Sequence, residues 1–119
     1  MALTEFGKAV RKARIEADIT LAEMAEDLEV TSPYLSGLET GRKKIPSEWV
    51  ARIERYFAAY EVKLPDLGVL ADIANESVSL EGLNSKQQML VAGFARTSFD
   101  SETLQRFTEL LKAAEGDEK

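Results

Sequence analysis

The fold of this protein is decided by residues 19–46, which read ITLAEMAEDLEVTSPYLSGLETGRKKIP. Thr20 is followed three residues later by Glu23, a spacing typical of the capping box that begins a helix. Apolar residues then recur at helical spacing as far as Leu28. The first half of the stretch therefore predicts a short helix over residues 20–28.

The second half of the stretch predicts another short helix, over residues 32–40. Thr31 is a typical N-cap residue, and Pro33 lies in the first helical turn, where its missing N–H removes no hydrogen bond. Gly41 suits the left-handed conformation that ends many helices. A run of three cations, Arg42 to Lys44, follows directly. The two halves together predict a helix, a tight turn and a second helix.

Helical patterns continue on both sides of this stretch. Apolar residues recur with the helical period, and Ser47 and Asp100 stand where N-caps are expected. The sequence predicts further helices over residues 3–17, from Ser47 onward, over 65–75, over 84–98 and from Asp100 onward. Only Val78 to Leu80 alternates in the manner of a strand, and we expect one short strand there.

The charge of the chain is unevenly distributed. The net charge is −6 over 119 residues. Residues 1–63 hold ten Lys or Arg against eleven Asp or Glu, a net of −1, whereas residues 64–119 hold five against ten, a net of −5. Screening limits the reach of the acidic half to about 8 Å at physiological salt, so a local basic surface remains compatible with this composition. We expect two domains, divided at 63/64.

The composition excludes several classes of protein. The chain has no cysteine and no histidine, which rules out a disulfide framework, a zinc site of the usual ligands and a Ser-His-Asp triad. No apolar run is long enough to span a bilayer, and the first twelve residues lack the apolar core of a signal peptide. We expect a cytoplasmic protein that is not an enzyme, with no catalytic residues, no metal, no cofactor and no membrane partner.

The central stretch resembles the signature of the phage-repressor (Cro/Xre-type) helix-turn-helix regulators, and the resemblance covers roughly residues 3–60. The matching positions are Leu21, Ala22, Glu23, Met24, Ala25, Leu28, Val30, Thr31, Leu35, Ser36, Leu38, Glu39, Gly41 and the basic run after it. The resemblance implies an all-α, five-helix-type (lambda-repressor-like) DNA-binding domain in residues 1–63. Its second short helix would enter the major groove of double-stranded DNA.

The resemblance also implies a role for each matching position. The residues on the base side would be Ser32, Pro33, Tyr34, Ser36 and Gly37. The residues on the phosphate side would be Thr20, Thr40, Arg42, Lys43 and Lys44. Arg14 and Glu39 would form a structural brace between the first and third helices and would not contact DNA.

Two positions depart from the family pattern, and others allow a simpler interpretation. Glu29 stands where the turn usually carries glycine, and Gly37 stands where the family often has a long hydrogen-bonding side chain. Without that side chain, DNA shape would supply more of the specificity. Tyr34 would either reach the DNA or only cover the turn, and the basic run would either meet phosphates or be a solvated loop.

Residues 64–119 form a helical extension for which we expect a role in dimerisation. Apolar residues nearly encircle the helix over 84–98, so more than one of its sides needs a cover. One final amphipathic helix covers one side only, and a second subunit is the obvious cover for the rest. The residues expected at the dimer interface are Leu90, Phe94, Leu104, Phe107 and Leu111.

Two functions from different classes are compatible with this sequence. The first is a sequence-specific transcriptional regulator, a homodimeric repressor that binds an inverted-repeat operator through helix 32–40. The second is the antitoxin of a toxin–antitoxin pair, in which the acidic second half binds a basic protein toxin and the first half represses the shared promoter. A toxin-like gene beside this one would distinguish the two.

Overall fold

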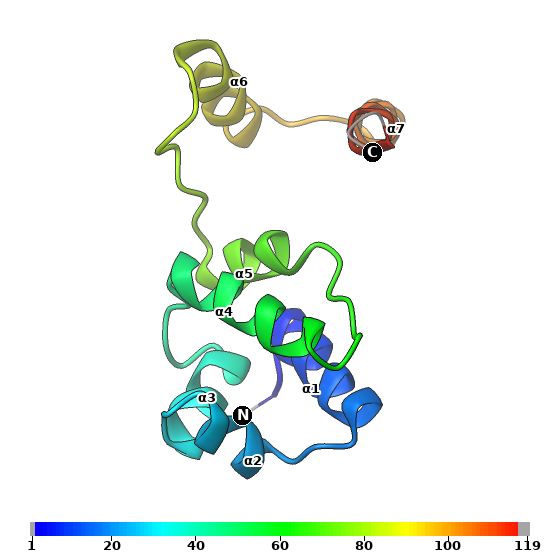
Figure 1. The fold of residues 1–119 in the computed structure, drawn as a ribbon. Coiled ribbons are helices and arrows are strands. Elements are labelled where there is room, and N and C mark those ends of the chain that lie inside the picture. Colours follow the sequence, from blue (N-terminus) through cyan, green and yellow to red (C-terminus); the bar gives the residue numbers. More distant parts are fainter. Residues whose placement is uncertain (1, 117–119) are drawn as a thin grey trace. The chain divides into compact units, whose positions relative to one another are not determined.

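The computed structural model describes residues 2–116, which contain helices and no strand (Figure 1). The expected all-α fold is therefore confirmed. The helices are α1 (Glu5–Ala17), α2 (Leu21–Asp27), α3 (Ser32–Thr40), α4 (Ser47–Ala58), α5 (Leu67–Asn75), α6 (Ser85–Ala95) and α7 (Ser101–Gly116). The strand expected at residues 78–80 is wrong. This segment has no neighbouring strand among the described residues, and a lone segment cannot form a hydrogen-bonded ladder.

Short polar side chains begin most of these helices. Thr4 accepts from the backbone N–H of Gly7 at 3.0 Å, and Asn84 accepts from that of Gln87 at 2.8 Å. These bonds satisfy backbone donors that the first turn leaves without partners. The expected cap at Ser47 is wrong, because Pro46 is the N-cap of α4 and makes no side-chain bond.

One hydrophobic core lies within the helices α1 to α5. Helix α4 contributes three buried side chains at spacings of four, Trp49, Ile53 and Phe57, which place them on one face. The other buried apolar residues are Phe6, Val10, Ala13, Met24, Ala25, Leu28, Leu35, Leu38, Ile45, Val62, Leu67 and Ala71. Each large side chain contributes about 1.5–3 kcal/mol by leaving water. This core holds the helix-turn-helix in place.

Helix α5 belongs to the same compact unit as the first four helices. It packs against α1 and α4, and the unit extends to Ser79. The boundary between the two compact units, at 79/80, therefore lies beyond 63/64, the position of the expected domain division. Residues 1–63 omit Leu67 and Ala71, which are buried in the core of this unit.

A second compact unit begins at Leu80 and includes α6 and α7. Neither helix contributes a buried residue, although both carry several large apolar side chains. The backbone N–H of Thr103 donates to the Asp100 carboxylate at 2.8 Å, so Asp100 caps α7 as expected. None of residues 80–116 is buried, whereas the first unit has a buried core.

Candidate nucleic-acid interface

The helix-turn-helix consists of α2, a turn over residues 28–31 and α3. Both halves of the capping box are present at Thr20: its hydroxyl accepts from the N–H of Glu23 at 3.0 Å, and its own N–H donates to the Glu23 carboxylate at 2.9 Å. Glu29 adopts the left-handed conformation with φ 60°, which the family pattern usually gives to glycine. Thr20 is exposed at the beginning of α2, where backbone N–H groups point outward.

Helix α3 has one face in the core and one face toward solvent. Thr31 caps it by accepting from the N–H of Tyr34 at 3.1 Å. Leu35 and Leu38 are buried, whereas Pro33 is exposed and Ser32 is half-buried. The first turn of α3 is therefore accessible to a ligand that approaches from outside.

Ser36 lies three residues after Pro33, so the two residues are neighbours on the surface of α3. It contributes to a hollow of about 420 Å³ whose lining includes Arg11 of α1 and Leu21 of α2. The Ser36 carbonyl also accepts from the Thr40 hydroxyl at 2.9 Å. Ser36 therefore lies beside α1 and α2.

Gly37 is buried although it follows the exposed Pro33 by one helical turn. Lys43 covers it. A Cβ atom placed on Gly37 would lie 2.9 Å from Cδ of Lys43 and 3.1 Å from its Cγ and Cε. The backbone N–H of Lys43 donates to the Gly37 carbonyl at 3.1 Å. The loop after α3 therefore folds back over the middle of this helix.

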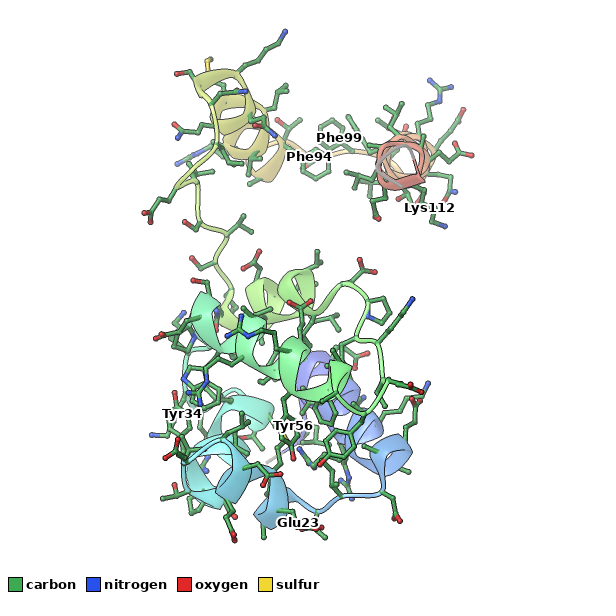
Figure 2. All side chains as sticks on the ribbon, viewed as in Figure 1. Glu23, Tyr34, Tyr56, Phe94, Phe99 and Lys112 are labelled. Atoms are coloured by element: carbon green, nitrogen blue, oxygen red, sulfur yellow. The ribbon has the colours of Figure 1, made fainter. Side chains whose placement is uncertain are left out.

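Aromatic and cationic side chains form a row beside α3. The Lys43 ammonium lies 5.8 Å from the ring centroid of Tyr34, which lies 5.4 Å from that of Trp49. The Arg52 guanidinium lies 4.2 Å from the Trp49 ring, and it donates to the Leu28 carbonyl in the turn at 2.9 Å. Tyr34, labelled in Figure 2, is half-buried, and so is Arg52.

The sequence analysis missed Arg52. Arg52 follows Trp49 by three residues on one helix, and residues at this spacing are neighbours on a helix surface. This spacing is the signal that could have suggested the contact between Arg52 and Trp49. No local pattern connects Arg52 with Leu28, since these residues belong to different elements.

The three cations after α3 have different surroundings. Lys44 donates through Nζ to the backbone carbonyl of Asn75, and the Asn75 side chain bonds both the N–H and the C=O of Ile45, at 2.8 and 3.0 Å. Lys43 covers Gly37 as described. Within residues 2–116, Arg42 is exposed and has no hydrogen-bond or ion-pair partner. Asn75, which fixes this segment to the end of α5, was also missed, because nothing in the sequence relates two positions thirty residues apart.

Arg14 and Glu39 form a buried, two-pronged ion pair between α1 and α3. Nη2 of Arg14 donates to Oε1 of Glu39 at 3.0 Å, and Nη1 donates to Oε2. The two side chains are 8% and 6% exposed, so neither is available to DNA. Nη1 also contacts the sulfur of Met24 at 3.6 Å, which links the pair to α2.

The five residues expected at a dimer interface lie in α6 and α7. Leu90, Leu104 and Leu111 are 64%, 42% and 66% exposed. Phe94 and Phe107 form a ring cluster with Phe99, with centroid separations of 4.9 to 5.3 Å; Phe94 and Phe99 are labelled in Figure 2. A mainly apolar hollow of about 640 Å³ adjoins the cluster, and its lining includes Leu90 and Leu111.

Two further findings concern other kinds of site. In the part of the chain that the structure describes, no three His, Cys, Asp or Glu side chains are grouped so that they could bind a metal ion. None of the helices among residues 2–116 combines the length and the apolar character needed to cross a bilayer.

The comparisons with known proteins agree with the geometry of the first unit. A family model described as a helix-turn-helix domain matches residues 5–73, well over half of the 119 residues. The match includes α1 to α4 and most of α5. Neither the curated proteins nor the solved structures contain a significant match to this chain.

Proposed function

The chain belongs to the helix-turn-helix domain family, and from this premise we propose that it is a homodimeric transcriptional repressor of the phage-repressor (Cro/Xre) type. The observation that carries the proposal is α3 itself, a short helix with an accessible first turn, braced from behind and bordered by exposed polar and cationic groups. A helix of this width fits the major groove of B-form DNA, where base edges can be distinguished.

The proposed base-facing residues are Ser32, Pro33, Tyr34, Ser36 and Gly37. Hydroxyl groups accept from or donate to base edges, and Pro33 offers an apolar contact to a thymine methyl group. Tyr34 combines two roles in this proposal: it faces the bases, and its ring packs against Trp49, which holds the first turn of α3 in place. Specificity that these small side chains do not supply comes from the shape of the DNA.

The proposed phosphate contacts are Thr20, Thr40, Arg42, Lys43 and Lys44. The exposed position of Thr20 at the beginning of α2 and the free guanidinium of Arg42 support this assignment. Lys44 contacts phosphate in this scheme from a position fixed by its bond to Asn75. The net charge of −6 leaves little general attraction for polyanions, so binding depends on this local surface.

Dimerisation is proposed to occur through α6 and α7. Their exposed leucines and the apolar hollow beside the phenylalanine cluster provide surface that a second copy would remove from water. A dimer binds two half-sites about 34–36 Å apart, and such a complex represses by blocking access to a promoter.

An antitoxin is the second candidate function. The same exposed apolar surface, in the half of the chain that carries a net charge of −5, would suit a basic protein partner. Co-expression with the product of a neighbouring toxin-like gene, followed by co-purification, distinguishes this role from a repressor that acts alone.

The proposal is tested by selecting bound duplexes from a random DNA pool at about 0.15 M salt. We expect enrichment of an inverted repeat whose half-sites are centred one helical turn apart. Arg42→Ala should weaken binding to all sequences and lower the salt slope by about one unit. The matched control is Lys63→Ala. Lys63 is an exposed cation that lines a hollow together with Lys12 and Glu16 of α1. If no sequence is enriched, or if both variants behave alike, the proposed interface is wrong.

A further inference from the structure

The burial of Gly37 is unexpected for its position on α3. Leu35 and Leu38 turn toward the core, and Pro33, one turn before Gly37, is exposed. Position 37 therefore belongs to the outer face of the helix, where a side chain would project toward DNA. Gly37 has no side chain with which to cover itself, so another residue must exclude solvent from it.

The stem of Lys43 occupies the space that a side chain at position 37 would take. Three of its carbons, Cγ, Cδ and Cε, lie 2.9 to 3.1 Å from the place of a Cβ on Gly37. The hydrogen bond from the Lys43 N–H to the Gly37 carbonyl, 3.1 Å long, fixes the origin of this side chain beside the helix. Lys43 is thus positioned through both its backbone and its stem.

The ammonium group of Lys43 is directed toward the N-terminal half of α3. It lies 5.8 Å from the ring centroid of Tyr34, and Trp49 supports that ring from behind. Attraction between a cation and the face of an aromatic ring favours this placement over free rotation in solvent. The positive charge of Lys43 therefore lies beside Tyr34, one of the proposed base-facing residues, and not only in the loop that follows α3.

We propose that Lys43 is a specificity-determining residue, which crosses α3 at Gly37 and donates to the N7 and O6 acceptors of a guanine in the major groove. This inference rests on the proposed function and changes the role of Lys43 from a phosphate contact to a base reader. A glycine is then needed at position 37 for base reading, because any Cβ there displaces the stem of Lys43.

The test compares the binding motifs of four variants with that of the full-length wild-type protein, by selection from a random duplex pool. Lys43→Ala should lose the preference for guanine at one position of each half-site, by about tenfold. Gly37→Ala should lose the same preference, since its Cβ forces the exposed Lys43 side chain away. Lys43→Arg should keep the preference, because a guanidinium also donates to N7 and O6. Arg42→Ala, the control, should weaken binding to all sequences and leave the motif unchanged.

Thermal unfolding of each variant distinguishes loss of reading from loss of folding. Gly37→Ala should unfold at the wild-type temperature or above it, since alanine has the higher helix propensity. A uniform loss of affinity in Lys43→Ala, with the motif and all base preferences retained, would show a phosphate contact and overturn the inference while the proposed function stands. A wild-type protein that enriches no motif would overturn both.

Discussion

At the scale of single residues, the ion pair between Arg14 and Glu39 has the largest consequence for stability. Both charged groups are buried, and the bonds between them satisfy the carboxylate. The Glu39 carbonyl also accepts from the backbone N–H and the hydroxyl of Thr4, each at 3.0 Å. A buried pair of this kind is costly to break, because removal of one partner leaves an uncompensated charge.

We therefore predict that Glu39→Ala lowers the free energy of unfolding by about 3–5 kcal/mol. The measurement is urea-induced unfolding followed by circular dichroism. The matched control is Glu102→Ala, which removes an ion pair with Arg106 in which both side chains are more than 70% exposed. That variant should change stability by less than about 1 kcal/mol. Equal effects of the two substitutions would contradict the structural role assigned to the buried pair.

At the scale of helices, the close approach of α1 to α3 depends on Gly7. A Cβ atom on this residue would lie only 2.1 Å from the Glu39 carbonyl oxygen, a backbone atom that cannot rotate away. The absence of a side chain at Gly7 therefore sets the distance at which Arg14 meets Glu39. A single glycine in the first helix thus determines how α3 is supported.

Gly7→Ala should destabilise the first unit by about 1–3 kcal/mol or more, since overpacking forces the two backbones apart. Gly68→Ala in α5 is the control, because a Cβ there meets nothing within 4 Å. The control should leave the thermal midpoint unchanged or raise it. If Gly7→Ala unfolds at the wild-type temperature, α1 and α3 are not in the contact described.

The cap of α7 makes the beginning of this helix sensitive to pH. The backbone N–H of Thr103, with help from the Thr103 side chain, holds the pKa of Asp100 below its ordinary value. A lowered pKa in the folded state stabilises the helix above the pKa of the unfolded chain, about 3.9, and this contribution is lost as the pH falls through the folded value. Acid should therefore loosen the first turn of α7.

This expectation is measured from the chemical shift of the Thr103 amide proton as the pH is lowered. Its midpoint should lie below the ordinary value for aspartate, and Asp100→Asn, which keeps an oxygen acceptor without the charge, should abolish the titration. A midpoint at or above the ordinary value would mean that the cap does not form.

At the scale of the whole molecule, the two compact units differ in how they bury apolar surface. The first unit surrounds its core with five helices, whereas no residue of α6 or α7 is buried. Large exposed apolar surfaces are rare on monomers and usually mark a contact with another molecule. We therefore expect the second unit to control whether the chain is a monomer or a dimer.

Leu90→Glu and Leu111→Glu should each raise the dissociation constant of a dimer at least tenfold, as judged by analytical ultracentrifugation. Both side chains are about two-thirds exposed, so the substitutions remove little packing within the chain. Ile15→Glu in α1 is the control, since that residue is 72% exposed but lies in the first unit. A chain that sediments as a monomer before any substitution would contradict the dimer proposal.

The sequence alone determined the features that depend on neighbours along the chain. Thr20, Thr31 and Gly41 predicted the ends of α2 and α3 correctly, because a cap bonds backbone groups within three or four residues. The helix-turn-helix assignment, which the family match over residues 5–73 supports, arises from the same local pattern. Ser47 misled because a serine before a helix and a serine in its first position look alike in sequence.

Only the tertiary structure decided the features that depend on contacts between distant residues. The boundary at 79/80 follows from the packing of α5 on α1, and no charge pattern could show it. Likewise, the sequence shows only that position 37 lacks a side chain. The structure shows that the side chain of Lys43, six residues later, lies over this position. The physical reason is common to both cases: local bonds are encoded in a few adjacent residues, whereas the path of a side chain over another element depends on how the whole core packs.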